Sequence, residues 1–274
     1  MPTYSVTLDV PKELIAYVVR LLRAERVRRG TRTGTRSLTC AKQALFVLAW
    51  FRDRPNVSRL GHGFGLSQAT AYRYLTEGIA VLAAQAPDLH EALERAKAVG
   101  LSHLILDGTT IGCDRVRETK TSRKGKEIDA WYSGKTHDFG GLLQALMSPG
   151  GVPLWISEVL PGSVHDITAA RDLVLAALAP YLRRLPILAD GGYDGAGHGV
   201  YTPVKKPKDG YELDTDTRTY NRLLRGLRCL GERGFALLTQ RWTTLRHVML
   251  SPRRIGQIAR AALVLTQFEH RIIT

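Results

Sequence analysis

The chain is poor in cysteine and has no long apolar run, and each shortage excludes a class of protein. Its three cysteines, Cys40, Cys113 and Cys229, are far apart in the 274 residues and never form a C-x-x-C pair. This spacing argues against a zinc site and for a reducing cytoplasm. No apolar run approaches the roughly 18 residues that a membrane-spanning helix requires, and we expect no signal peptide. A cytoplasmic protein with no membrane partner is therefore expected.

Carboxylates are also in short supply. The 25 aspartates and glutamates are outnumbered by 39 lysines and arginines, which gives a formal net charge of +14 and a pI of about 10.0. Such an excess indicates a polyanionic partner, and nucleic acid is the leading candidate because counterion release supplies most non-specific affinity. A merely soluble basic protein is the alternative. Residues 1–100 hold 15 basic and 8 acidic residues, and residues 101–274 hold 24 basic and 17 acidic residues. The excess positive charge is therefore spread over both parts of the chain and is not confined to a basic tail.

The sequence pattern changes from helices to strands near Gly100. Before this glycine, segments such as residues 12–29 place apolar side chains at helical spacing among arginines. After it, the apolar runs "HLILDGTTIGC" and "GGLLQALM" read as strands, with "SPGG" as a turn. The length allows two cores. We therefore expect an α+β protein with an all-α domain at residues 1–98 and a mixed α/β domain at residues 99–274.

The run "NVSRLGHGFGLSQATAYRYLTEGIAVLAA" at residues 56–84 predicts a helix-turn-helix unit. Gly65 supplies the tight turn, and Ser67 is a good N-cap for a second amphipathic helix. In such a unit the start of the second helix enters the major groove of DNA. An ordinary helical hairpin is the alternative, because glycine turns between amphipathic helices are common. The candidate DNA readers are Gln68, Thr70, Tyr72 and Arg73.

Two further segments carry basic residues at positions suited to phosphates. The first, "GTRTGTRS" at residues 30–37, reads either as a phosphate-binding loop or as a solvated linker. The second, residues 117–135, reads as a long basic hairpin or loop, in which Trp131 and Tyr132 either stack on a ligand or pack. Its candidate phosphate ligands are Arg123, Lys124, Lys126 and Lys135.

Three carboxylates follow a pattern typical of metal-dependent phosphoryl transfer. Asp107 and Asp190 each end an apolar, strand-like run, and Glu232 lies in a basic, helix-like stretch. Two divalent ions held by such oxygen ligands stabilise both the attacking and the leaving oxygen of an in-line displacement. Three strands, a helix and a strand ending in Asp190 is the element order of a ribonuclease-H-like sheet. Each carboxylate alone also has a simpler role, as a turn residue or, for Glu232, as an ion pair with Arg228.

The chain around these residues resembles the DDE transposases of bacterial insertion sequences, in particular the insertion-sequence-five type related to Harbinger-like DDE endonucleases. The resemblance covers roughly residues 38–265, and its most specific pieces are "PGSVHD", "LADGGYDG" and "GERGF". It implies that Asp107, Asp190 and Glu232 are the catalytic triad and bind two Mg²⁺ or Mn²⁺ ions. It also implies cleavage and joining of double-stranded DNA at element ends and target site, a homodimer in the DNA complex, and a nucleoid-associated place in the bacterial cytoplasm.

Several neighbouring residues have less certain roles. Arg228, Arg233 and Arg241 surround Glu232 and either hold DNA phosphates or form a solvated helix face. His165, together with Asp166, is more simply interpreted as a helix cap than as a catalytic group. Asp194 is the rival of Asp190, but it lies beyond the glycine pair that follows the strand.

Two other functions fit the same sequence. A domesticated DDE nuclease would hydrolyse DNA without joining ends. A helix-turn-helix repressor with an inactive nuclease domain would bind DNA and show no metal-dependent cleavage. The complete set of three carboxylates favours the transposase.

Overall fold

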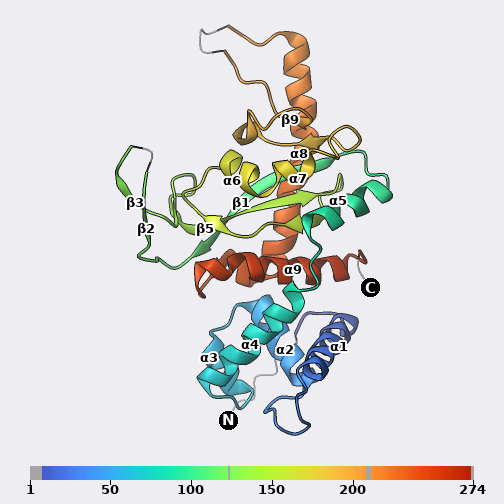
Figure 1. Ribbon diagram of the computed structural model, residues 1–274, viewed down its shortest axis with the longest axis vertical. Helices are drawn as coiled ribbons and strands as arrows, with labels where there is room; N and C mark the ends of the chain where they lie inside the picture. The colour runs from blue at the N-terminus through green and yellow to red at the C-terminus, as the bar shows by residue number, and fades with distance from the viewer. Residues whose placement is uncertain (1–7, 123, 208–210, 273–274) are drawn as a thin grey trace. The chain divides into compact units, whose positions relative to one another are not determined.

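The computed structural model describes residues 8–122, 124–207 and 211–272, and the chain forms two compact units. The helical unit comprises Met1–Ala86, Thr239–Arg246 and Gln257–Thr274, and the sheet unit comprises Pro87–Leu238 and His247–Gly256. Figure 1 follows the order of the elements along the chain. Within the described ranges, no helix has both the length and the apolar character needed to span a lipid bilayer.

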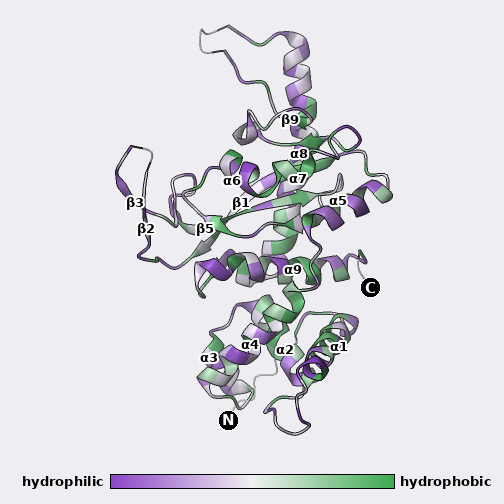
Figure 2. Ribbon diagram, viewed as in Figure 1, coloured by the Kyte–Doolittle hydropathy of each residue, from purple (hydrophilic) through white to green (hydrophobic). Residues whose placement is uncertain are grey.

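Four N-terminal helices and most of the last helix build the helical unit. They are α1 (Lys12–Arg28), α2 (Cys40–Asp53), α3 (Val57–Gly63), α4 (Gln68–Ala83) and α9 (Ile255–Glu269). Apolar and hydrophilic residues alternate along these helices, as the mixed colours of Figure 2 show. Tyr17 of α1 stacks on Phe268 of α9 with ring centroids 4.6 Å apart. The fully buried Trp242 donates from Nε1 to Thr266 Oγ1 of α9 at 2.9 Å, so the end of the chain completes this core.

The turn between α3 and α4 lies where the sequence predicts it. Gly65 has a φ of +70°, a conformation that suits glycine, and Ser67 Oγ accepts a hydrogen bond from Thr70 N at 3.4 Å as the N-cap of α4. The two helices pack closely, since a Cβ atom at Gly61 would lie 2.5 Å from Ala71 Cβ. The structure therefore has the helix pair, and its use on DNA stays a prediction.

The sheet unit contains a mixed sheet around a long central strand. Strand β1 (Leu104–Cys113) pairs antiparallel with β5 (Asp138–Met147), which pairs antiparallel with β6 (Pro153–Ile156). On its other edge β1 pairs parallel with β8 (Ile187–Leu188), which pairs parallel with β9 (Val200–Tyr201). Short strands extend the edges: β4 (Tyr132–Ser133), β7 (Leu160–Pro161) and β10 (His247–Val248). The mixed α/β character expected of this part of the chain is confirmed.

The basic segment after Arg117 contains a hairpin and two aromatic residues whose roles the sequence left open. Strands β2 (Thr119–Thr121) and β3 (Glu127–Asp129) form a separate antiparallel hairpin, as the basic segment after Arg117 predicts. Trp131 is buried and donates from Nε1 to Glu118 Oε2 at 2.9 Å, so it packs within the protein. Tyr132 is more exposed and meets Phe139 edge to face.

Helices α5 (Leu89–Ala98), α6 (Asp166–Leu173), α7 (Leu175–Leu178) and α8 (Thr215–Arg241) belong to the sheet unit, apart from the last residues of α8. Short 3₁₀ helices also occur: η1 (Gly191–Tyr193) before α8, and η2 (Thr243–Arg246) and η3 (Pro252–Arg254) after it. The apolar face of α5, including Leu89 and Leu93, is buried with Leu104 and Ile187 of the sheet. The compact units therefore differ from the expected domains 1–98 and 99–274. The side chains of α5 pack on apolar residues of the strands, and α9 packs on α1.

Candidate active site

Strand β1 places Asp107 at the centre of the sheet. Its side chain is 8 % exposed, and Gly108 N donates to its Oδ1 at 3.0 Å. Burial raises the pKa of Asp107 to about 6, and the negative charge of Asp190 adds to the rise, whereas Gly108 N and the charges of Arg228 and Lys135 oppose it. Asp107 is therefore a desolvated carboxylate with two cationic groups and a second carboxylate around it.

The second aspartate reaches the same place through the parallel pairing of β8 with β1. Asp190 lies two residues after the end of β8 and caps η1, where its Oδ1 accepts from Gly192 N at 2.7 Å. Because β8 lies beside β1, Asp190 acts on the pKa of Asp107 although the two are far apart in the sequence. The structure thus brings the two predicted aspartates together.

Helix α8 approaches Asp107 with a glycine. A Cβ atom at Gly231 would lie 3.6 Å from Asp107 Oδ2 and 2.9 Å from Ile105 Cγ2. One turn along, a Cβ atom at Gly234 would lie 2.3 Å from Met147 Sδ, so this side of the helix lies directly on the strands. The two glycines of "GERGF" therefore explain how α8 comes close enough to reach the aspartates.

Glu232 lies next to Gly231 on α8, but its side chain is 71 % exposed. Its Oε1 is 3.9 Å from an Nη atom of Arg228 one turn earlier, which is the helical ion pair that the sequence offers as the simpler role of Glu232. Arg228 itself is 18 % exposed and acts on Asp107. In the described part of the chain, no three His, Cys, Asp or Glu side chains are grouped as a metal site. Asp107 and Asp190 are thus brought together, whereas the exposed Glu232 side chain is not grouped with them in the described part of the chain.

Asp166 is a third carboxylate at this site. It is the first residue of α6, and its Oδ2 accepts from Lys135 Nζ at 3.0 Å. A Cβ atom at Gly108 would lie 2.4 Å from Asp166 Oδ1, and one at Gly192 would lie 3.5 Å from Oδ2. Asp166 therefore fits between the glycines that follow the two aspartates. The sequence analysis interprets Asp166 as part of a helix cap. It does not predict that Asp166 lies beside Asp107 and Asp190, although "PGSVHD" is one of the specific motifs.

Lys135 is the cation of this cluster. Burial alone would lower its pKa, but the hydrogen bond to Asp166 and the charges of Asp166, Asp190 and Asp107 raise it. The sequence predicts Lys135 only as one basic residue of a long loop. Its position among the three carboxylates could not be read from the sequence, because the loop folds back to the sheet from β4.

A buried hydrogen bond lies beneath the cluster. Tyr193 Oη donates to Gln144 Oε1 at 2.6 Å, and Gln144 stands opposite Gly108 in the β1–β5 register. Burial, followed by the charges of Asp166, Asp107 and Asp190, raises the pKa of Tyr193 far above its usual range, so its hydroxyl stays protonated. Gln144 Nε2 and Asp166 Oδ1 are both buried without a hydrogen-bond partner among the described residues. They are polar atoms placed beside the site with unused hydrogen-bonding capacity.

The sequence pattern of the DDE superfamily endonucleases matches residues 106–267, more than half of the chain and all of this site. The chain belongs to the DDE superfamily endonucleases. It is also 24 % identical over 228 residues to the probable transposase for insertion sequence element IS702 from Microchaete diplosiphon. That alignment covers 81 % of this chain and 78 % of the relative. No solved structure has significant similarity to the chain.

The residues predicted to bind DNA lie at several places on the chain. Gln68, Tyr72 and Arg73 are exposed on the first turns of α4, and Thr70 is half-buried there. Lys124 and Lys126 are exposed in the turn of the β2–β3 hairpin, and Arg123 lies outside the described residues. Arg233 is exposed and reaches Gly150 O at 3.5 Å.

Arg241 has a different environment from the one expected of a phosphate ligand. Its Nε and Nη2 both bond to the Glu269 carboxylate, at 2.9 and 2.6 Å, and its Nη1 bonds to Asp9 Oδ2 at 2.8 Å. These bonds lie within the helical unit. Arg241 is thus neutralised inside the protein, because α9 supplies a carboxylate that the sequence around Glu232 does not reveal. His165 is exposed and makes no capping hydrogen bond at the start of α6.

The rival second aspartate, Asp194, also has its own partner. Its Oδ2 is 2.9 Å from Lys205 Nζ, and this hydrogen bond holds the pKa of Asp194 below its usual range. Asp194 does not appear among the groups whose charges shift the pKa of Asp107. Its geometry therefore favours Asp190 as the partner of Asp107.

The donor set of the site suits a hard divalent cation. Mg²⁺ and Mn²⁺ prefer carboxylate oxygens, and Asp107 and Asp190 are two such groups whose burial and mutual repulsion a divalent charge would relieve. DDE superfamily endonucleases generally use divalent metals. Asp107 and Asp190 fit this requirement, and Glu232 becomes a third ligand only if its exposed side chain turns toward them.

Proposed function

We propose that the protein is a transposase that binds the ends of an insertion sequence and catalyses metal-dependent DNA strand cleavage and strand transfer. The observation that carries this proposal is that Asp107 on β1 lies close to Asp190, which follows the neighbouring strand β8, in a member of the DDE superfamily endonucleases. The strand order β6–β5–β1–β8–β9 supports a ribonuclease-H-like fold. The similarity to a probable insertion-sequence transposase supports DNA as the substrate. The insertion-sequence-five, Harbinger-like type is proposed from the resemblance of the sequence motifs alone.

Asp107, Asp190 and Glu232 would hold two Mg²⁺ or Mn²⁺ ions. When bound, such ions lower the pKa of an attacking water or DNA 3′-hydroxyl and stabilise the leaving 3′-oxygen. The protein's own groups contribute the charge around the reaction. Arg228 and Lys135 place positive charge beside Asp107, where the scissile phosphate would enter, and the protonated Tyr193 keeps Gln144 oriented below Gly108.

Exposed basic residues of both units would bind the DNA itself. Residues on α4 would contact the element ends as part of a helix-turn-helix, and Lys124 and Lys126 would contact phosphates from the β2–β3 hairpin. Transposition joins two ends of an element, so we propose a homodimer in the DNA complex, acting at the bacterial nucleoid. No membrane contact is part of this proposal.

One observation supports the nuclease-inactive alternative. Glu232 is exposed and is not grouped with the two aspartates among the described residues, so a repressor that retains the fold but cleaves nothing is the second candidate. The test is nicking and strand transfer on labelled DNA from the ends flanking the gene, with Mg²⁺ or Mn²⁺. Cleavage with joining supports the transposase, cleavage alone indicates a domesticated nuclease, and binding without cleavage indicates a repressor.

A further inference from the structure

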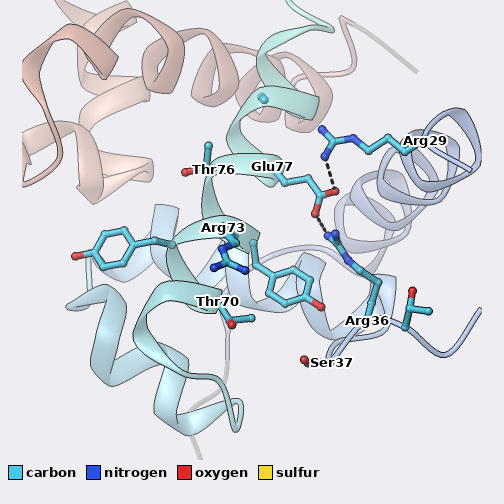
Figure 3. Close-up of a pocket in the computed structure, with 11 residues that line it drawn as sticks. Arg29, Arg36, Ser37, Thr70, Arg73, Thr76 and Glu77 are labelled. Atoms are coloured by element: carbon cyan, nitrogen blue, oxygen red, sulfur yellow. Dashed lines mark hydrogen bonds and ion pairs between the residues drawn. The ribbon is translucent and has the colours of Figure 1, made fainter. Parts of the chain in front are cut away.

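A polar pocket of about 630 Å³ lies within the helical unit, beside the first turns of α4 (Figure 3). One wall is α4, from Thr70 to Ala80, and the other is the end of α1 with the loop that carries Arg36. Hydroxyl groups line it on both sides, from Thr35 and Ser37 of the loop and from Thr70 of the helix. The "GTRTGTRS" segment is thus one wall of a cavity, which neither a free linker nor a separate phosphate loop would predict.

A buried ion pair fixes the two walls to each other. Glu77 of α4 is 7 % exposed, and its carboxylate binds an Nη atom of Arg36 from the loop. Gln43 Nε2 donates to the same Glu77 oxygen at 2.8 Å, and Arg29 Nη1 is 3.4 Å from the other one. The Arg36 guanidinium also lies over the ring of Tyr74, 4.8 Å from its centroid. Arg36 therefore acts as a strut between loop and helix.

The lining residues of the pocket have a net positive charge even when these ion pairs are included. Three of its lining residues are arginines and one is a carboxylate, Glu77. Arg29 is further neutralised by Glu25, whose carboxylate is 2.5 Å from its Nε. Arg73 has no ion pair or side-chain hydrogen bond within the described residues, and in Figure 3 its guanidinium lies near the centre of the site. An unpaired guanidinium beside hydroxyl groups suits a phosphate oxygen.

We propose that this pocket is a binding site for a backbone phosphate of DNA, with Arg73 and the hydroxyl groups of Ser37 and Thr70 as its ligands and the Arg36–Glu77 pair as its positioning element. The site rests on the proposed binding of DNA by α4. It assigns Arg73 to the backbone and leaves Gln68, which does not line the pocket, as the residue that reads bases. A phosphate held here would fix the register of α4 on the duplex.

The test measures binding of the full-length protein to two fluorescent duplexes of about 30 base pairs, by anisotropy across a salt titration. One duplex carries sequence flanking the gene, and the other is its shuffled counterpart. Arg73→Ala should weaken binding to both by a similar factor, about 3- to 10-fold, and reduce the salt slope by about 1. Arg73→Lys keeps the charge and should keep the slope. Arg23→Ala, at an exposed arginine of α1 that does not line the pocket, is the matched control and should change binding less than about twofold.

Two further variants distinguish the phosphate site from base reading and from a general effect of charge. Gln68→Ala should reduce only the preference between the duplexes. Glu77→Gln removes a negative charge, so simple electrostatics predicts tighter binding, whereas loss of the strut predicts weaker binding to both duplexes, which is the result we expect. A loss for Arg73→Ala that is confined to the flanking duplex with an unchanged salt slope would make Arg73 a base reader and overturn the proposal. Failure of the wild-type protein to bind either duplex would instead remove the proposed function.

Discussion

Asp166 Oδ2 accepts a hydrogen bond from Lys135 Nζ at 3.0 Å, and this ion pair stands beside both Asp107 and Asp190. The pair joins the start of α6 to the loop after β4, two segments that only the folded chain brings together. It gives a cationic group a fixed place at the carboxylates, where a phosphate substrate would meet it.

Asp166→Asn should lower the rate of metal-dependent DNA cleavage by about tenfold or more, because Lys135 loses its charged anchor. DNA affinity should stay near the wild-type value, since the basic surface is unchanged. The measurement is single-turnover cleavage alongside a binding titration at fixed salt. Asp172→Asn, at an exposed aspartate of the same helix, is the control. A wild-type cleavage rate for Asp166→Asn would show that the ion pair has no part in the reaction.

Alanine at Asp107, Asp190 or Glu232 should abolish strand cleavage and joining in Mg²⁺ or Mn²⁺ while DNA binding persists, because each change removes a proposed oxygen ligand. Asp194→Ala should retain cleavage, since Asp194 pairs with Lys205. Nicking of labelled end-containing DNA, with a parallel gel-shift titration, checks this. Full cleavage by Glu232→Ala would remove the triad. Cleavage by Asp190→Ala together with an inactive Asp194→Ala would move the second ligand to Asp194.

Stability without metal should fall as pH rises through about 6. The folded-state pKa of Asp107, about 6, lies above its ordinary value of 3.8, so its contribution favours folding when the carboxyl is protonated. That contribution is complete below pH 3.8 and is lost above 6. Asp107→Asn should therefore be more stable than wild type at pH 7.5, by at most about 3 kcal/mol, and equal to it near pH 4. Urea unfolding with EDTA measures this.

Asp194→Asn gives the opposite sign and serves as the control for this pH effect. Its pKa is lowered by Lys205, so its carboxylate favours folding at neutral pH and the amide should not be stabilising. A neutral-pH gain of similar size in both variants would point to a general effect of net charge instead of the desolvation of Asp107.

Gly234→Ala should destabilise the protein by about 1–3 kcal/mol, because the added Cβ would lie 2.9 Å from Gly151 O and closer still to Met147 Sδ. Gly226→Ala, on the same helix with nothing within 4 Å of its Cβ position, should stabilise it by up to about 1 kcal/mol through helix propensity. Thermal unfolding of the two variants compares them directly. Equal effects would mean that α8 does not rest on the strands at Gly234.

Local patterns in the sequence were enough for the elements and for part of the site. The Gly65 turn, the Ser67 cap and the change from helices to strands near Gly100 depend on neighbouring residues, and the structure has all three. The positions of Asp107 on β1 and of Asp190 just after β8 also follow from short apolar runs, although β1 continues beyond Asp107 to Cys113. The order of strands, helix and strand in a ribonuclease-H-like sheet places the two aspartates on adjacent strand positions, so their proximity could be predicted.

Long-range packing decided the rest. Lys135 and Asp166 reach the carboxylates because a loop and a helix start fold back onto the sheet, and no spacing in the sequence encodes that approach. Arg241 is neutralised by Glu269 and Asp9, which lie far from it along the chain. A charged residue can be identified from the sequence alone. Its ion-pair partner depends on which surfaces pack against each other in the folded chain.

The sequence by itself determined that this is a basic chain with a helical part, a mixed sheet and carboxylates on or just after short apolar strands, because periodicity, turn residues and charge are local properties. The tertiary structure decided where the cations go: Lys135 to the carboxylates of the candidate site, Arg241 into an internal ion pair and Arg36 into a strut against Glu77. The physical reason is that each pair forms only where apolar packing has already brought distant segments together, so the burial of the core sets the electrostatics.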